Sequence, residues 1–137
     1  MSRILIVEDH SDIRRLIRWS LEFEGHELQE ATHGEAGLAL ARSWRPDLVL
    51  MDVMMPGAID GYEVCRQIKA DPQLGGTPVI MLTARAQASD RQAGDAAGAD
   101  AYISKPFSPM ELSDAVERLL ATVRQDGRKS SGQVSVS

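Results

Sequence analysis

The chain of 137 residues is long enough for one domain with its own core, and 43% hydrophobic with 26% charged residues is typical of a globular protein. No apolar run approaches the roughly 18 to 20 residues of a membrane helix, and residues 1–3 do not resemble the start of a signal peptide. The single cysteine, Cys65, cannot form an internal disulfide and is expected to be a buried core thiol. We therefore expect a cytoplasmic protein that does not associate with membranes.

The charge is spread unevenly along the chain. The net charge is −5, but residues 1–123 hold 12 Lys and Arg against 19 Asp and Glu, while residues 124–137 hold three basic residues and one acidic residue. Direct nucleic-acid binding is not expected, because phosphate contacts require clustered basic side chains. Gly, Ser, Lys and Arg are frequent at the end of the chain, so we expect one domain over 1–123 and a disordered tail over 124–137.

The first elements expected are a strand, an amphipathic helix and a second strand. The strand covers about 3–8, and the helix then places apolar side chains at helical spacing. Three arginines lie between those side chains, and a solvated face is favoured over a docking patch for them. The strand at 27–31 is more polar and is expected at a sheet edge. The spacing of Thr32 and Glu35 predicts a capping box at the start of the next helix.

Short apolar runs continue to alternate with longer amphipathic segments. The elements expected after residue 32 are a helix to about Trp44, a strand at 48–52, a helix at 61–70, a strand at 79–83, a weak Ala-rich helix at 89–98, a strand at 101–104 and a helix at 109–123. Such alternation is typical of repeated strand-helix units with a parallel sheet. We predict an α/β, doubly wound fold in which helices, five in all, cover a five-stranded parallel sheet.

Polar groups with chemical potential end or follow four of these strands. Glu8 and Asp9 follow the apolar run of the first strand, Asp52 ends the third strand, Thr83 ends the fourth and Lys105 follows the fifth. Ligand sites of open parallel sheets lie at the carboxyl ends of the strands. Each residue alone has an ordinary explanation as a turn or cap residue. Together they indicate one site at one edge of the sheet.

The expected chemistry is phosphoryl transfer to a carboxylate. Clustered carboxylates repel one another, by roughly 4 kcal/mol for a pair about 4 Å apart, unless a cation bridges them. Mg²⁺ suits one or two carboxylates together with phosphate oxygens. Asp52 is then the nucleophile, and Lys105 and the Thr83 hydroxyl can bind the phosphate oxygens. A cis peptide between Lys105 and Pro106 would direct the lysine inward, and proline lowers the cost of that isomer.

Five stretches of sequence resemble the receiver domains of two-component response regulators, in particular the single-domain chemotaxis regulators. They are residues 4–9, 46–57, 60–63, 78–84 and 98–107. The resemblance covers about residues 3–123, which implies a receiver domain at 1–123 with the flavodoxin-like receiver fold.

The resemblance also implies a role for each site residue. Asp52 corresponds to the phospho-acceptor, and Glu8 and Asp9 correspond to the metal-binding acidic pair, with Asp52 itself and the backbone carbonyl of Met54 as further Mg²⁺ ligands. Thr83 and Lys105 correspond to the switch hydroxyl and the phosphate-pairing lysine. Tyr102 corresponds to the switch aromatic residue, although an ordinary half-buried strand aromatic is the alternative interpretation.

Partners follow from the same resemblance. A histidine kinase or phosphotransfer protein would supply the phosphoryl group, and a downstream protein would bind helix 89–98, strand 101–104 and helix 109–123. The chain would not be an enzyme beyond its own phosphorylation and dephosphorylation, and it would be a monomer or a phosphorylation-dependent dimer. An aspartyl-nucleophile, Mg²⁺-dependent phosphatase and a phosphorylation-independent adaptor are the alternatives.

The sequence departs from the family pattern at two places. Ala58 and Ile59 put two residues between Gly57 and the Asp-Gly pair, where the family commonly has one. Ala101 stands where many DNA-binding relatives carry a second aspartate. We expect the first departure to alter the loop beside the site and the second to weaken charge pairing in a dimer.

Overall fold

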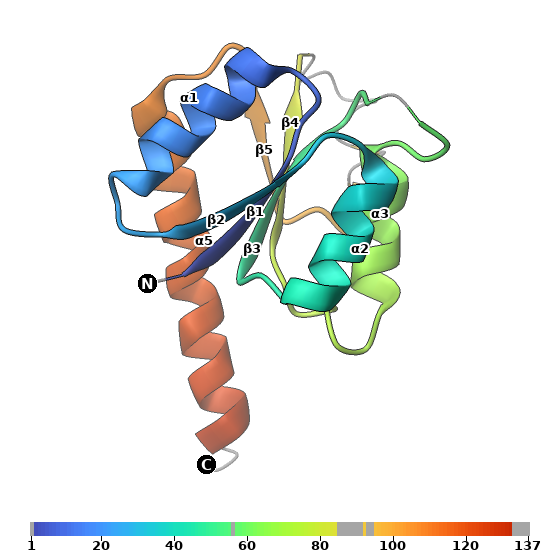
Figure 1. Ribbon diagram of the computed structural model, residues 1–137. Coiled ribbons are helices and arrows are strands. Elements are labelled where there is room, and N and C mark those ends of the chain that lie inside the picture. The colour runs from blue at the N-terminus through green and yellow to red at the C-terminus, as the bar shows by residue number, and fades with distance from the viewer. Residues whose placement is uncertain (1, 56, 85–91, 93–94, 133–137) are drawn as a thin grey trace.

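A single parallel sheet forms the centre of the molecule, with helices on both sides (Figure 1). The structure, a computed structural model, describes residues 2–55, 57–84, 92 and 95–132, with side chains up to residue 122. Its elements are β1 (Arg3–Val7), α1 (Ser11–Glu22), β2 (Glu27–Ala31), α2 (Gly34–Trp44), β3 (Leu48–Asp52), α3 (Gly61–Ala70), β4 (Val79–Thr83), β5 (Ala101–Ser104) and α5 (Pro109–Gly132).

The strand order is β2-β1-β3-β4-β5, and every neighbouring pair is parallel. The polar strand β2 lies at an edge, as the sequence predicts, while β3 and β4 are buried along their whole length. The predicted doubly wound fold is therefore confirmed. Because β1 and β3 are neighbours, the residues that follow them are placed side by side at the carboxyl edge of the sheet.

Alternate strand residues build a separate core on each face of the sheet. In β1, Ile4 and Ile6 pack toward α1 and α5, whereas Leu5 and Val7 pack toward α2 and α3. Figure 1 shows the same division, with α1 and α5 on one side of the sheet and α2 and α3 on the other. Cys65 belongs to the second core and is fully buried, as predicted.

Polar side chains cap the starts of α2, α3 and α5, and one of these caps differs from the prediction. Asp60 caps α3 by accepting a hydrogen bond from the Glu63 amide at 3.0 Å. The predicted capping box of Thr32 and Glu35 is wrong. The N-cap of α2 is His33, whose ring accepts a bond from the Ala36 amide at 3.3 Å. The Glu35 carboxylate instead accepts a hydrogen bond from the Ala58 amide in the loop that follows β3.

Two segments near the end of the chain bear on the predicted organisation. Of the helix expected at 89–98, residues 92 and 95–97 are helical, and 89–91, 93 and 94 lie outside the described residues. The last helix, α5, continues to Gly132, although the sequence predicts a tail from residue 124. That stretch contains no proline to end the helix. The division into a domain at 1–123 and a tail at 124–137 stays a prediction.

None of the helices that the structure describes combines the length and the hydrophobicity needed to cross a lipid bilayer.

Candidate functional site

The carboxyl edge of the sheet brings four of the predicted residues into contact. Glu8 and Asp9 follow β1, Asp52 ends β3, and Lys105 follows β5. The ammonium group of Lys105 lies 3.0 Å from Asp52 Oδ1 and 2.9 Å from Glu8 Oε1. One lysine therefore joins Glu8 and Asp52, and a ligand atom of Asp9 lies within 4.8 Å of both carboxylates.

The Asp52 carboxylate is held in an unfavourable setting for negative charge. Asp52 is only 3% exposed, and the neighbouring Glu8 is completely buried. Burial, followed by repulsion from Glu8, raises the pKa of Asp52 to about 6, even though Lys105 acts in the opposite direction. A group that neutralises charge here thus gains more than it would at an exposed carboxylate.

Lys105 stays positively charged in this setting. Burial alone would lower its pKa, but hydrogen bonds and charge attraction from Glu8 and Asp52 outweigh burial and raise it. The Lys105 backbone amide also donates to the Thr83 carbonyl at 2.8 Å, and the Lys105–Pro106 peptide is cis, as predicted. The lysine is thereby tied to the end of β4 as well as to the carboxylates.

Thr83 is buried at the end of β4, next to the strand that carries Asp52. In the register of the two strands, Asp52 lies opposite Leu82, so Thr83 stands one residue beyond Asp52 at the same edge. The register thus places the Thr83 backbone beside the end of β3, and the role of its hydroxyl stays a prediction.

Sequence reasoning did not identify two further side chains at this edge. His10 places Nδ1 3.1 Å from Glu8 Oε2 and 3.2 Å from Asp9 Oδ1, and the hydrogen bond to Glu8 and then the charge of Asp9 raise the pKa of His10. Arg14, expected on a solvated face, donates to the Glu8 carbonyl at 2.8 Å and to Glu30 at 3.1 Å. The position of His10 directly after the acidic pair was the available signal.

The acidic residues fit a divalent cation. One ligand atom each from Glu8, Asp9, His10 and Asp52 lies within 4.8 Å of the others. Asp52 Oδ2 is buried and has no hydrogen-bond partner among the described residues. A buried carboxylate oxygen without a donor is costly unless a cation or a donor reaches it. The donor set is rich in carboxylate oxygen, which suits Mg²⁺.

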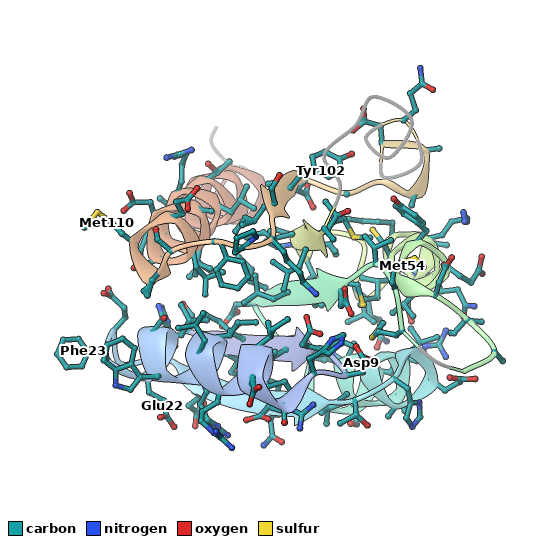
Figure 2. The ribbon with its side chains drawn as sticks, turned by 90° about the horizontal axis from the view of Figure 1, so that it is seen from above. Asp9, Glu22, Phe23, Met54, Tyr102 and Met110 are labelled. Atoms are coloured by element: carbon teal, nitrogen blue, oxygen red, sulfur yellow. The ribbon has the colours of Figure 1, made fainter. Side chains whose placement is uncertain are left out.

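Met54 and Tyr102 lie on the loop after β3 and on β5. Figure 2 looks down on this edge of the sheet and shows Asp9, Met54 and Tyr102 there. The Met54 side chain is 77% exposed, so it lies beside the site without belonging to the core. Tyr102 is half-buried, and its hydroxyl donates to Asp95 Oδ1 at 2.5 Å. That bond connects β5 to the helical residues 95–97.

The family model for the response regulator receiver domain matches residues 4–117 of this chain. The chain belongs to this family. It is 45% identical over 124 residues to the transcriptional regulatory protein ResD of Bacillus subtilis, a match that covers 90% of this chain and 50% of ResD. The receiver domain described here thus spans about half the length of that curated relative.

Solved receiver structures share its fold. The chemotaxis response regulator CheY4 of Vibrio cholerae has a TM-score of 0.82 and 33% identity, with coverage of 87% of this chain and 98% of CheY4. The receiver domain of the sensor histidine kinase PA1611 from Pseudomonas aeruginosa, solved with a magnesium ion in its active site cleft, has a TM-score of 0.81 and 32% identity, and the coverage is 88% and 98%. Such domains are typically signalling modules without an enzymatic activity toward other substrates.

The longer loop of this receiver domain is fastened to α2. The Glu35 carboxylate accepts a hydrogen bond from the Ala58 amide at 3.1 Å. Hydrogen bonds from its own backbone amide and that of Ala58 lower the pKa of Glu35. A Cβ added at Gly34 would lie 2.8 Å from the Ile59 carbonyl oxygen, so Ile59 packs directly on the start of α2. Ala58 and Ile59 therefore both contact the start of α2.

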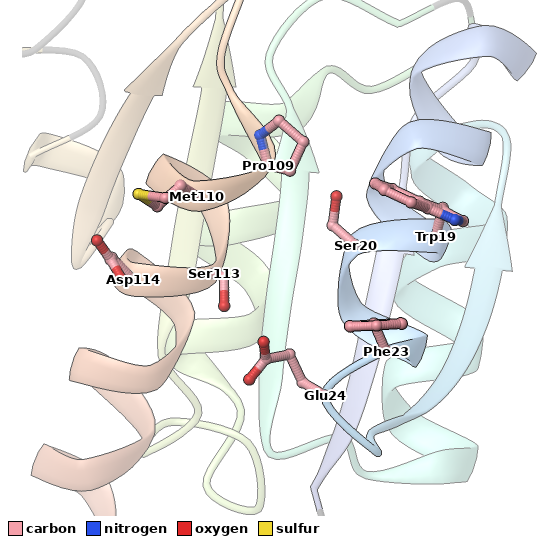
Figure 3. A pocket seen from close by; sticks show the side chains of 8 residues that line it. All are labelled: Trp19, Ser20, Phe23, Glu24, Pro109, Met110, Ser113 and Asp114. Carbon is pink, nitrogen blue, oxygen red and sulfur yellow. The ribbon is translucent and has the colours of Figure 1, made fainter.

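An apolar groove lies between α1 and α5, apart from the residues named so far. Its volume is about 360 Å³, and Trp19, Phe23 and Met110 line it with exposed apolar side chains (Figure 3). The Trp19 and Phe23 rings are stacked, with centroids 6.5 Å apart. None of the predicted site residues lines this groove, so the groove is separate from the acidic cluster at the carboxyl edge of the sheet.

Proposed function

We propose that this receiver domain accepts a phosphoryl group on Asp52 and thereby switches a surface for a protein partner. The observation that carries the proposal is the buried Asp52 carboxylate at the end of β3, 3.0 Å from the Lys105 ammonium and beside the acidic pair. In the transfer, a carboxylate oxygen of Asp52 attacks phosphorus and the bond from phosphorus to the donor breaks. The phosphohistidine of a kinase or phosphotransfer protein is the proposed donor.

The electrostatics of the site support this assignment. Lys105 bridges Asp52 and Glu8, so its charge is available both to the free carboxylate and to the oxygens of a phosphoryl group. The buried Thr83 stands at the adjacent strand end and is the proposed hydroxyl donor to those oxygens. Glu8, Asp9, Asp52 and the carbonyl of Met54 are the proposed Mg²⁺ ligands. The cation would neutralise charge on the transferred group.

The proposed switch runs from Thr83 and Lys105 to the far end of the sheet. Phosphorylation adds about −1.5 to −2 charge at one point. Pulling the loops after β4 and β5 toward that charge would also move Tyr102, which holds Asp95. The surface around helix 89–98, β5 and α5 is the proposed output. Residues 85–91 of this path lie outside the described residues.

Partner and assembly belong to the same proposal. ResD is named a transcriptional regulatory protein, and this chain spans half of it, so the role in transcription is a property of that relative. We infer that the region described here contacts proteins and not nucleic acid, because its charge is strongly acidic. We expect either a monomer or a phosphorylation-dependent dimer. Because position 101 is alanine and not an acidic residue, charge pairing across such a dimer would be weaker.

One experiment tests the proposed function. The protein is incubated with Mg²⁺ and acetyl phosphate, and its intact mass and elution volume are measured. We expect a gain of one phosphoryl group that is absent in Asp52→Ala and without Mg²⁺. A mass that never changes with any small phospho-donor would leave only an adaptor that shares the fold. Continuous turnover of generic phosphate esters would favour the hydrolase instead.

A further inference from the structure

His10 occupies the position where a cation would meet the acidic pair. Its ring nitrogen Nδ1 lies 3.1 Å from Glu8 Oε2 and 3.2 Å from Asp9 Oδ1. The residue is the N-cap of α1, yet its side chain makes no capping hydrogen bond. The imidazole therefore faces the carboxylates instead of the helix end, and it is 65% exposed, so it can move without disturbing the core.

The ring adds a nitrogen to a pocket otherwise made of oxygen. Donor atoms of Glu8, Asp9, His10 and Asp52 lie within 4.8 Å of one another, which is close to the span of ligands around a single ion. A second, independent feature points to a cation. Asp52 is 3% exposed and its Oδ2 atom has no hydrogen-bond partner within the described part of the chain.

The chemistry of imidazole distinguishes two classes of cation. Mg²⁺ takes oxygen ligands and keeps its waters, whereas Co²⁺, Ni²⁺ and Zn²⁺ bind imidazole nitrogen well. Toward Mg²⁺, the His10 ring is a competitor, because Nδ1 is hydrogen-bonded to Glu8 Oε2 and lies 3.2 Å from Asp9 Oδ1, and the ion needs both carboxylates. Toward the second class, the same ring is a ligand. One residue thus changes the affinity for the two classes in opposite directions.

We propose that His10 makes the acidic pocket a site for imidazole-binding divalent transition ions, with Nδ1 as a ligand, in addition to Mg²⁺. The inference rests on the proposed function only in using the same carboxylates. It requires no phosphoryl transfer, so it is tested without a phospho-donor.

The experiment titrates Ni²⁺ and, separately, Mg²⁺ into the wild-type protein and His10→Ala, with calorimetry as the measurement. We expect His10→Ala to weaken Ni²⁺ binding at least tenfold, and to leave Mg²⁺ affinity unchanged or higher. Since His10 makes no capping bond, the substitution should not harm α1. The matched control is His33→Asn, which removes an imidazole at the start of α2 while asparagine keeps the cap.

A second measurement observes the ring directly. Zn²⁺ added to the wild-type protein should shift the imidazole nitrogen resonances of His10 and leave those of His26 and His33 in place. Equal changes in Ni²⁺ and Mg²⁺ affinity in His10→Ala, no change in either, or the same loss in His33→Asn would each overturn the proposal. Phosphorylation of Asp52 with Mg²⁺ alongside any of those results would leave the proposed function intact. Absence of binding by either cation in the wild type would overturn both.

Discussion

The Asp52 carboxylate is buried beside the buried carboxylate of Glu8, and this arrangement lowers the free energy of unfolding of the cation-free protein. Folding raises the pKa of Asp52 from 3.8 to about 6, mainly through burial and then through Glu8. A raised pKa means that the folded state binds the proton more tightly. The protonated Asp52 side chain therefore contributes to the stability of the folded protein near pH 4, and this contribution is lost as the pH rises through about 6.

Asp52→Asn should consequently raise the free energy of unfolding near neutral pH in the absence of divalent cations, by about 1 to 3 kcal/mol. The gain should shrink near pH 4, where the wild-type residue is protonated, and should also shrink on addition of Mg²⁺. Urea unfolding at the two pH values, with and without the cation, measures it. The control is Asp12→Asn, since the Asp12 side chain is 94% exposed and should show little change. A destabilised Asp52→Asn protein near neutral pH would contradict this account.

Cys65 gives a second prediction that depends on one side chain. The residue is fully buried, its thiol donates to the Ala97 carbonyl at 3.4 Å, and burial raises its pKa to about 11. Because the thiolate is the reactive form, the native thiol should react with a disulfide reagent near pH 8 at least about 100-fold more slowly than the unfolded chain. The measurement is the rate of reaction with and without urea. Equal rates would mean that α3 does not shield Cys65.

The same thiol gives a sign for alkaline stability. The pKa of Cys65 in the folded protein lies above the usual value of 9.0. The protonated thiol therefore contributes fully to stability below pH 9, and this contribution is lost as the pH rises toward 11. Cys65→Ala should therefore flatten the alkaline fall in the free energy of unfolding, on top of a loss from the cavity that it leaves.

At the scale of elements, the contact between α3 and β3 fixes the loop that follows Asp52. The backbone at Gly61 approaches so closely that an added Cβ would lie 2.2 Å from the Asp52 carbonyl oxygen. A backbone atom inside a sheet cannot move aside as a flexible side chain can. Only glycine therefore allows α3 to begin at this point.

Gly61→Ala should lower the free energy of unfolding by about 2 to 4 kcal/mol and reduce phosphorylation by acetyl phosphate, because either α3 or the end of β3 must shift. Gly76→Ala is the matched control. No atom lies within 4 Å of an added Cβ at Gly76, and its φ is not in the left-handed region. Chemical denaturation of both variants provides the comparison. A Gly61→Ala protein as stable as Gly76→Ala would show that the close approach is not a real constraint.

The elements show which features the sequence can specify. Buried strands such as β3 and β4 are short, continuous apolar runs, and their ends are marked by Asp52 and Thr83, so both the strands and the site were predictable. The cap of α2 was not, because Glu35 bonds the Ala58 amide 23 residues away, and local spacing does not carry that contact.

Contacts at the site divide in the same way. Strand ends place Asp52 and Lys105 together through topology alone. The ring of His10 and the reach of Arg14 to the Glu8 carbonyl depend on side-chain rotamers and on the entry into α1. The end of α5 is a weak signal for a related reason, since polar residues without a proline favour helix and disorder about equally.

At the scale of the whole molecule, a continuous set of contacts leads from the acidic edge to the far edge of the sheet. The Lys105 ammonium touches Asp52, and its amide bonds the Thr83 carbonyl. Three residues before Lys105, Tyr102 donates from β5 to Asp95. A phosphoryl group that draws Lys105 and Thr83 inward therefore acts on an element that this hydrogen bond already restrains. In the proposed switch, the bond between Tyr102 and Asp95 belongs to the resting arrangement.

Removing that bond should favour the phosphorylated arrangement. A hydrogen bond to a charged acceptor is worth about 1.5 to 3 kcal/mol when buried, and partial exposure here reduces it to about 1 kcal/mol, or roughly fivefold in an equilibrium. We expect Tyr102→Phe and Asp95→Ala each to tighten the binding of beryllofluoride, a phosphoryl mimic, by a few-fold in the presence of Mg²⁺. The double variant should add little to either, because both changes break one bond. Independent, additive effects, or weaker binding in both single variants, would mean that the bond does not restrain the switch.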